Sequence, residues 1–540
     1  MFNQPPALEG YDLFGMDAAL REGVEREGAG WSRSRLERFG RELGRSETLR
    51  WGDEANRSGP ALRTHDRFGH RVDEVEYHPA WHSLMRLGVE HEVHSLAWTA
   101  PQPAGQVARA GLLYLLTQVE AGVGCPLSMT YAGVPALRRE PTVAAEWEPK
   151  LFSRAYDPRS VPVAEKAGAL VGMAMTEKQG GSDVRANTTR ALPLDAEAVE
   201  AELVGHKWFC SAPMCDAFLT LAFLEEDERE PTCFLVPRFR PDGTKNPILI
   251  QRLKDKLGNR SNASSEIEYH GAWARRVGEP GRGIATILGM VQHTRLDCVI
   301  ASAALMRQAL VQAVWHARHR RAFGRLLADQ PLMQNVIADL ALESEAATVS
   351  MLRLARAYDR SSTLPREAAF ARLATAALKY WVCKRTPAVV AEALECLGGN
   401  GYVEESILPR LYREAPLASI WEGSGNVICL DVLRVLSREP EGAPAVLAEL
   451  DDAAAAEPRL RPHVEALRCL LAERPDPGQA RRLTERLALV LQAALLVGSG
   501  QVEVAAAFVA TRLDGDHGRA LGTLPPGVAL GLLADRAWPA

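Results

Sequence analysis

The feature that most constrains this chain is a change of pattern along it, from helical to β-rich and back to helical. Between about residues 168 and 285, short β-rich runs alternate with Pro, Gly and Asp turns. The runs are Phe218–Leu224, Cys233–Val236, Ile248–Leu253 and Glu266–Tyr269. Such spacing is typical of a compact antiparallel β domain. We therefore expect a β domain set between two helical regions.

The regions on either side of this block have the apolar spacing of helices. Upstream, aliphatic residues crowd positions 112–119 in the manner of a buried helix. A long helix is expected after Glu279–Gly283, and further helices up to about residue 437. We expect interruptions at Pro365, Pro387, residues 398–401 and Pro409.

The predicted fold class is therefore α+β. A Pro- and Gly-rich break at 439–444 separates a last Ala- and Leu-rich helical segment from the bundle. The expected domains are an N-terminal helical domain (1–167), a central antiparallel β domain (168–284), a C-terminal helical bundle (285–438) and an extra C-terminal helical domain (439–540).

Composition limits the classes of function. With 540 residues and 47% hydrophobic content, the chain can form several packed units and has no compositional case for disorder. Its net charge of −5 gives no global electrostatic argument for nucleic acid binding. No apolar run approaches the length of a membrane span, and no secretory signal pattern is evident. Nine cysteines without a CxxC pair predict buried reduced thiols, no metal site and a cytoplasmic location.

Three segments carry residues suited to a cofactor or to catalysis. Met173–Asp183 leads into a turn whose backbone N–H groups and hydroxyls suit an anion or the edge of a ring, although a plain surface turn fits equally well. Lys207–Ser211 places a flat aromatic beside a hydroxyl, and Ile420–Asn426 flanks a carboxylate with an indole and glycines. A carboxylate in such a setting can be partly desolvated, which raises its pKa and makes it a competent base, although this segment alone fits an ordinary surface glutamate better.

In this order, the segments resemble the acyl-CoA dehydrogenase superfamily and, within it, the AidB branch of adaptive alkylation-response proteins. The family's flavin signature is matched by Thr176-Glu177 and Gly181-Ser182-Asp183. Its Lys-x-Trp-Ile-Thr element is matched loosely by residues 206–211. Arg320–Gly324, Gly398–Tyr402 and Trp421–Gly423 match three further family elements.

The resemblance implies noncovalent FAD and a homotetramer. Trp208 would stack on or edge the flavin ring, Ser211 would replace the family threonine, and Arg320 would contact the pyrophosphate. The full set of implied FAD contacts is Met173, Thr176, Gly181, Ser182, Trp208, Phe209, Ser211, Arg320, Phe323, Trp421, Gly423 and Asn426. No GxGxxG opens a helix after a strand, so a Rossmann dinucleotide site is not expected.

The resemblance also implies an acyl-CoA substrate and a catalytic base. Glu422 aligns with the glutamate that removes the α-proton of the thioester while the β-hydride goes to the flavin. Some members carry the base on the helix after the β domain, but Thr294 occupies that position here and cannot act as a base. Arg295, which follows it, is a candidate substrate contact.

The segment after residue 440 is typical of the AidB branch, where the resemblance implies binding of double-stranded DNA. From Arg438 to the end there are 11 arginines and 14 acidic residues, so any such binding would use local clusters. Arg481, Arg482 and Arg486 are the candidates, with Arg474 nearby, and a purely structural role is an equally good interpretation. Three functions stay open: a DNA-associated flavoprotein that protects against alkylation and weakly oxidises a short branched (isovaleryl-CoA-like) thioester, an ordinary catabolic acyl-CoA dehydrogenase, and a flavin oxidase of small nitrogenous compounds.

Overall fold

The computed structural model describes residues 2–224, 227–473 and 476–538. It divides into two compact units, each assembled from separate stretches of the chain. One unit, rich in strands, comprises residues 50–99 and 120–294. The other, helical unit comprises residues 1–49, 100–119 and 295–540. Arg474, named above near the candidate DNA contacts, lies outside the described residues.

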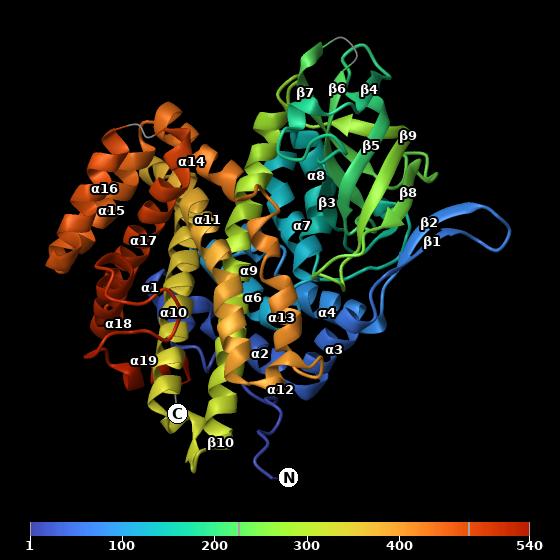
Figure 1. Cartoon of the computed structure of the whole chain (residues 1–540). Coiled ribbons are helices and arrows are strands. Elements are labelled where there is room, and N and C mark those ends of the chain that lie inside the picture. The colour runs from blue at the N-terminus through green and yellow to red at the C-terminus, as the bar shows by residue number, and fades with distance from the viewer. Residues whose placement is uncertain (1, 225–226, 474–475, 539–540) are drawn as a thin grey trace. The chain divides into compact units, whose positions relative to one another are not determined.

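The strand-rich unit contains the predicted β domain as one seven-stranded sheet (Figure 1). Its strands run in the order β3-β6-β4-β5-β9-β7, with β8 beside β9. Strand β6 also pairs with β7, so the sheet closes on itself. The strands are β3 (Val171–Ala174), β4 (Arg190–Pro193), β5 (Glu200–Ser211), β6 (Ala217–Leu224), β7 (Asp227–Pro237), β8 (Ile248–Leu253) and β9 (Ser264–Arg276).

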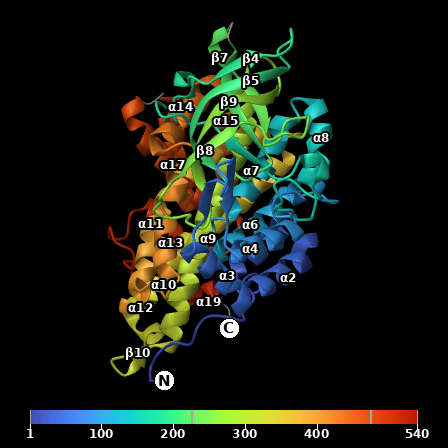
Figure 2. The same ribbon diagram turned by 90° about the vertical axis from the view of Figure 1, so that its right-hand side faces the viewer.

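Most pairings in the sheet are antiparallel, as the alternating runs and turns predicted, but β3 and β4 run parallel to β6. Figure 2 shows β8, β9, β5 and β4 side by side, and the longest antiparallel pair is β5 with β9. The register of the β5–β9 pair shifts between Lys207 and Cys210, so the two residues between them lack direct partners on β9. This irregularity falls on Trp208 and Phe209, both predicted cofactor contacts.

Helices and one hairpin complete the strand-rich unit. The hairpin, β1 (Ala61–His65) with β2 (Arg71–Glu76), was not predicted, because only helices with loops were expected in this region. Its turn is fixed by the Asp66 carboxylate, which accepts the N–H groups of Phe68 and His70. The helices are α3 (Ser46–Arg57, at the boundary of the units), α4 (Pro79–Glu90), α5 (Leu96–Thr99), α7 (Gly124–Leu137) and α8 (Pro141–Leu151).

The helical unit is built around α10 (Pro331–Arg360) and α11 (Pro365–Cys396). Both are buried on nearly every face over their central turns, which is the pattern of core helices. Around them lie α1 (Ala18–Arg26), α2 (Arg33–Leu43), α6 (Gly105–Val119), the long α9 (Gly283–His319) from Arg295 onward, α12 (Gly399–Tyr402), α13 (Leu408–Glu414) and α14 (Gly425–Arg438). The first turns of α9, up to Thr294, belong to the strand-rich unit. The predicted long helix begins at Gly283, the last residue of the Glu279–Gly283 break.

Two expectations about helices need qualification. Pro387 lies inside α11 and does not interrupt it, because the helix is held on both sides by buried packing. Helix α9 is long and apolar enough to cross a membrane by length and composition, although 83% of that stretch is buried inside the protein. Core helices of soluble proteins pass the same test, so this single helix is weak grounds for a membrane span.

The chain after residue 440 is helical, as predicted, and packs on α10 and α11. It forms α15 (Gly442–Ala456), α16 (Arg461–Ala472), α17 (Ala480–Gly498), α18 (Val502–Phe508) and α19 (Leu530–Ala537). Buried ion pairs tie it to the bundle: Arg512 contacts Asp339 and Glu343, and Arg536 contacts Glu345 at 2.6 Å. Removing one partner of such a pair is strongly destabilising, so this segment is an integral part of its unit.

Candidate active site

Glu422 lies in the turn that leads into α14. Its backbone is left-handed, with φ of 58°, and Gly423 follows with φ of 106°. A non-glycine residue at positive φ is uncommon and persists only where its surroundings hold it. Glu422 is therefore the strained point of this turn, which is where functional residues are often found.

Two buried cations hold the backbone on either side of the Glu422 side chain. The ammonium of Lys379, on α11, donates to the main-chain oxygens of Trp421 and Gly423. Arg295, on α9, donates from Nε to the main-chain oxygen of Glu422 at 3.1 Å. Three consecutive carbonyls are thus fixed by side chains from two other helices, which accounts for the left-handed conformation.

Arg295 is itself held in place. Its Nη1 lies 2.6 Å from the Asp431 carboxylate on α14, and both side chains are buried. Asp431 also accepts from Arg372. The Arg295 guanidinium is therefore already bonded to the Glu422 backbone and to Asp431. Its direct contact with substrate stays a prediction. Thr294, the alternative base position, donates its hydroxyl to the Val291 carbonyl within its own helix at 3.0 Å.

Trp421 packs beside Glu422 against a buried cluster of Cys298, Cys383 and Ala418. Its indole N–H is buried, yet it has no hydrogen-bond partner among the described residues. Buried polar groups are nearly always paired, so an orphaned N–H beside a candidate base fits a bound group that accepts its hydrogen bond. Burial, with the charge of Glu422 contributing, raises the pKa of Cys298, so this neighbouring thiol is neutral.

Asn426 stands in the first turn of α14, with an exposed side chain. Its Oδ1 accepts a hydrogen bond from Nε of Arg481 at 2.8 Å. A predicted FAD contact is therefore joined to a predicted DNA contact. The structure gives Arg481 a role in placing Asn426, and both binding roles stay predictions.

On the strand-rich unit, the Thr-Glu turn is anchored by a buried ion pair. The carboxylate of Glu177 lies 2.8 Å from Nζ of Lys207 on β5, and both side chains are fully buried. Thr188 and Thr189 also donate to this carboxylate. Burial raises the pKa of Glu177, but the charge and hydrogen bond of Lys207 outweigh it and lower the pKa to about 2. Glu177 therefore supports the turn as a permanent anion.

That anchor places Thr176 beside Trp208. The N–H of Trp208 donates to the main-chain oxygen of Thr176 at 2.7 Å, which joins the turn to the irregular part of β5. A Cβ at Gly181 would lie 3.1 Å from the Thr176 methyl, so the turn is closely packed there. Ser182 is exposed, and Met173 lies half-buried on β3.

The aromatic pair on β5 lies under a cation. Nζ of Lys254 is 3.3 Å from the centre of the Trp208 ring and 4.7 Å from that of Phe209. Phe209 is 48% exposed, so an aromatic surface remains available to a flat ligand. Ser211, at the end of β5, lies 3.5 Å from Ser264 between hydroxyl oxygens.

Arg320 and Phe323 lie at the far end of α9, in the short hairpin of β10 (Arg321–Ala322) and β11 (Arg325–Leu326). Arg320 donates to the main-chain oxygen of Asn3, which engages part of its guanidinium. Phe323 is 97% exposed and has a left-handed backbone, with φ of 51°. A large apolar side chain so exposed is a candidate for contact with another molecule.

The remaining arginine candidates differ from one another. Arg486 is half-buried and lies 2.6 Å from Nδ1 of His463, whose Nε2 contacts Asp514. Arg482 is exposed on the same helix, α17.

Of the free cysteines, Cys469 is exposed, so the expectation that the thiols are buried is wrong at this position and holds at the others. No cluster of side chains suited to a metal occurs in the described ranges.

Comparison with known proteins adds the family. The AidB N-terminal domain family matches residues 3–158, the acyl-CoA dehydrogenase middle domain 172–272, and the acyl-CoA dehydrogenase C-terminal domain 281–437. The chain is 49% identical to the Escherichia coli acyl-CoA dehydrogenase AidB over 81% of its own length and 80% of that protein. The chain belongs to the acyl-CoA dehydrogenase family, in its AidB branch.

Solved structures support the same fold. ACDH-11 of Caenorhabditis elegans, solved in complex with C11-CoA, has a TM-score of 0.85 at 27% identity, covering 93% of this chain and 92% of that one. An acyl-CoA dehydrogenase of Bacillus anthracis complexed with FAD has a TM-score of 0.61 at 18% identity, covering 81% and 78%. The second likeness supports the fold alone.

Family membership makes this chain an FAD-dependent oxidoreductase that acts on the CH–CH bond of acyl-CoA thioesters. Residues of each unit, taken by itself, fit that cofactor. In the helical unit, the orphaned indole N–H of Trp421 suits a group that accepts a hydrogen bond. In the strand-rich unit, the Thr176 turn and the exposed face of Phe209 suit a flat polar ring. Sequence reasoning missed Lys379, Lys207 and the anchoring role of Glu177. Glu177 and Lys207 both lie inside the matched motifs and carry opposite charges, and this was the signal that could have indicated their ion pair.

Proposed function

We propose that the chain dehydrogenates a short branched acyl-CoA, of the isovaleryl-CoA type, with Glu422 as the catalytic base. The observation that carries the base assignment is the left-handed Glu422, fixed by Lys379 and Arg295 through three consecutive carbonyls. A base whose backbone is held this firmly can present its carboxylate to the α-proton of a thioester with a lower cost of reorganisation. Bound FAD supplies the acceptor for the β-hydride.

The choice of a short branched acyl chain rests on the bulk of Trp421 beside the base. An indole restricts the space near the reacting carbons more than a tyrosine ring does. Anaerobic mixing of the FAD-loaded protein with isovaleryl-CoA, butyryl-CoA and a C11 acyl-CoA tests this directly. Flavin bleaching should be fastest with isovaleryl-CoA. Faster bleaching by the C11 acyl-CoA would show that the substrate is a long-chain acyl-CoA and not a short branched one. No bleaching by any thioester would favour an oxidase of small nitrogenous compounds.

A second proposed function is association with double-stranded DNA in protection against alkylation. It is supported by the match to the AidB N-terminal domain and by the exposed Arg482 on α17. Because Arg481 and Arg486 are engaged by Asn426 and His463, we propose Arg482 as the phosphate contact on this helix. Arg482→Gln should weaken duplex binding and lower the salt slope by about one, while Arg519→Gln serves as a control. If wild type does not retard duplex DNA in a gel at low salt, DNA binding is excluded and the ordinary catabolic enzyme is the better interpretation.

We also propose that the protein assembles as a homotetramer. Large apolar side chains are exposed on the helical unit: Phe323 at 97%, Leu332 at 81% and Tyr402 at 80%. Such exposure is typical of surfaces that associate. Light scattering should give four times the chain mass of 59.0 kDa, and Phe323→Ser should shift the protein toward smaller species.

A further inference from the structure

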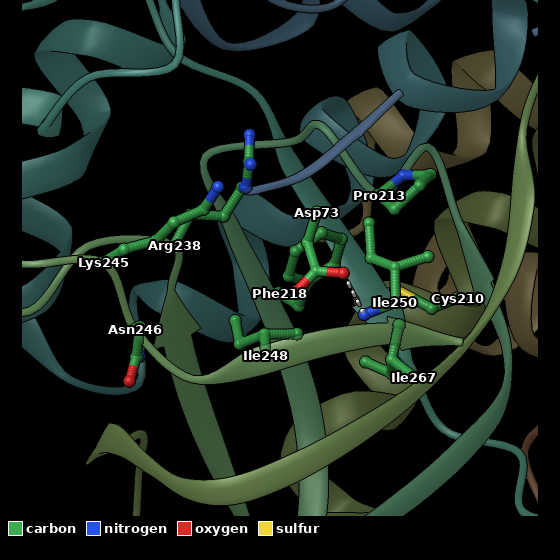
Figure 3. Close-up of a pocket in the computed structure, with 10 residues that line it drawn as sticks. All are labelled: Asp73, Cys210, Pro213, Phe218, Arg238, Lys245, Asn246, Ile248, Ile250 and Ile267. Carbon is green, nitrogen blue, oxygen red and sulfur yellow. Dashed lines mark hydrogen bonds between the residues drawn. The ribbon is translucent and has the colours of Figure 1, made fainter. Parts of the chain in front are cut away.

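A small pocket in the strand-rich unit is lined by two cations that make no ion pair with a described carboxylate. It is lined by Asp73, Cys210, Pro213, Phe218, Arg238, Lys245, Asn246, Ile248, Ile250 and Ile267 (Figure 3). Arg238 follows the end of β7, and Lys245 precedes β8. Figure 3 shows the nitrogen ends of these two side chains close together, beyond the apolar side chains that line the rest of the pocket.

Arg238 is the unusual member of this pair. Its side chain belongs to a residue only 7% exposed, and no side-chain hydrogen bond or ion pair joins it to another described residue. Burial lowers the pKa of Arg238. A buried charge is costly unless it is paired and hydrogen-bonded, and a guanidinium carries five N–H donors.

Lys245 does not offset the free-energy cost of burying the Arg238 guanidinium. Its ammonium donates to the main-chain oxygen of Val72 on β2, and no described carboxylate lies within ion-pair distance. Burial, and then the charge of Arg238, lower the pKa of Lys245. The charges of the two side chains repel each other, with Arg238 buried and Lys245 exposed to solvent.

The carboxylates in the neighbourhood each have a nearer cation. Asp73 lies 2.7 Å from Arg71 and also accepts the N–H of Ile250. Asp216 lies 2.7 Å from Lys166 and accepts the N–H of Leu170. Glu74 lies 2.5 Å from Arg63. These carboxylates attract Arg238 and Lys245 from a distance, but none of them forms an ion pair with either cation.

We propose that this pocket binds a small inorganic anion, of the size of chloride, between Arg238 and Lys245. The free space has room for about one water-sized sphere, which a halide fills and a larger oxyanion exceeds. The single negative charge of the anion attracts both cations and offsets one of the two positive charges. Because Lys245 also contacts Val72, the anion joins the β1–β2 hairpin to the β7–β8 connection. The site lies in the strand-rich unit and is independent of the proposed base and substrate.

Crystals of the full chain grown in sodium bromide test the site directly. The proposal expects an anomalous peak between the Arg238 guanidinium and Nζ of Lys245. Water density at that point, with bromide only on exposed arginines, would overturn it.

A solution measurement gives an independent readout. At constant ionic strength, replacing gluconate by chloride should raise the thermal midpoint of wild type by on the order of 1 °C, because chloride binds only the folded chain. Arg238→Gln should lose this chloride dependence. Arg240→Gln is the matched control, since Arg240 has its own partners in Glu202 and the Gly271 carbonyl. If Arg238→Gln does not fold, Lys245→Gln replaces it; a chloride response unchanged in these pocket variants would contradict the proposal.

Discussion

Lys379 donates to the carbonyls of Trp421 and Gly423, on both sides of Glu422, and so fixes the backbone of the proposed base. The ammonium is buried on α11, 43 residues before Glu422 in the sequence. Hydrogen bonds to a charged donor contribute more than neutral ones, and here two of them act on the carbonyls of the residues before and after Glu422. We regard Lys379 as a positioning residue.

Replacing this ammonium should therefore slow the chemistry while leaving binding intact. Lys379→Met should lower the rate of flavin reduction by about ten- to a hundred-fold, because a misplaced base loses its near-attack geometry. The apparent dissociation constant of acyl-CoA and the FAD content should stay near those of wild type. Rapid-mixing absorbance under anaerobic conditions separates the two quantities.

Lys384→Met is the matched control for that experiment. It lies on the same helix, with an exposed side chain, and should reduce flavin at the wild-type rate. A Lys379→Met protein that keeps its stability and reduces flavin as fast as wild type would show that the left-handed turn is held by its own sequence.

The buried pair of Glu177 and Lys207 should be a major contributor to stability. Glu177→Gln leaves the Lys207 ammonium buried without a counter-charge, a loss of about 3–5 kcal/mol. The double variant Glu177→Gln/Lys207→Met should regain part of that loss, because it removes both charges. Denaturant unfolding followed by circular dichroism measures the difference, and equal stability of the single and double variants would refute the interpretation.

The same pair predicts a pH dependence. The folded pKa of Glu177 is lowered to about 2 from an ordinary value near 4.5, so its contribution is complete above pH 4.5 and lost as pH falls toward 2. Over that window the free energy of unfolding should fall by on the order of 3 kcal/mol. The variant Glu177→Gln should show a correspondingly flatter profile between pH 5.5 and 3. Identical slopes in wild type and variant would contradict this prediction.

Trp208 should contribute to FAD affinity through its ring. Trp208→Leu removes the aromatic surface beside Lys254 and should raise the dissociation constant of FAD by about tenfold. Trp273→Leu serves as a control, because that indole donates to Glu200 at the rim of the sheet. Titration of the apoprotein with FAD, followed by flavin fluorescence, compares them. Equal affinity in wild type and Trp208→Leu would remove Trp208 from the cofactor site.

The fold was largely predictable because its signals are periodic. Alternation and turns located strands β6 to β9, and helical spacing located α9. The β1–β2 hairpin escaped prediction since its strands are polar and have only two buried positions, Asp73 and Val75, and only the Asp66 turn indicates it. Pro387 was misread because packing of α11 outweighs the local cost of a proline. The two parallel pairings depend on long-range strand order, which no local pattern encodes.

The sequence names candidate site residues where a motif carries the side chain that would act. Glu422, Thr176 and Trp208 were assigned in this way, and their roles stay predictions. Lys379 could not be found because it acts on main-chain oxygens contributed by a distant segment. The engagement of Arg481 with Asn426, and of Arg486 with His463, likewise depends on how α17 packs. Charge counting along the sequence could not separate these tethered arginines from the exposed Arg482.

The most direct test of the central claim is single-turnover flavin reduction by isovaleryl-CoA in wild type and Glu422→Gln. The amide keeps the shape of the side chain and cannot accept the α-proton. Loss of a general base costs on the order of a hundred- to ten-thousand-fold, so bleaching should slow by at least that lower bound, with FAD content unchanged. Glu441→Gln, at an exposed helix cap, should behave as wild type. Reduction of the Glu422→Gln flavin within a few-fold of the wild-type rate would contradict the assignment of Glu422 as the base.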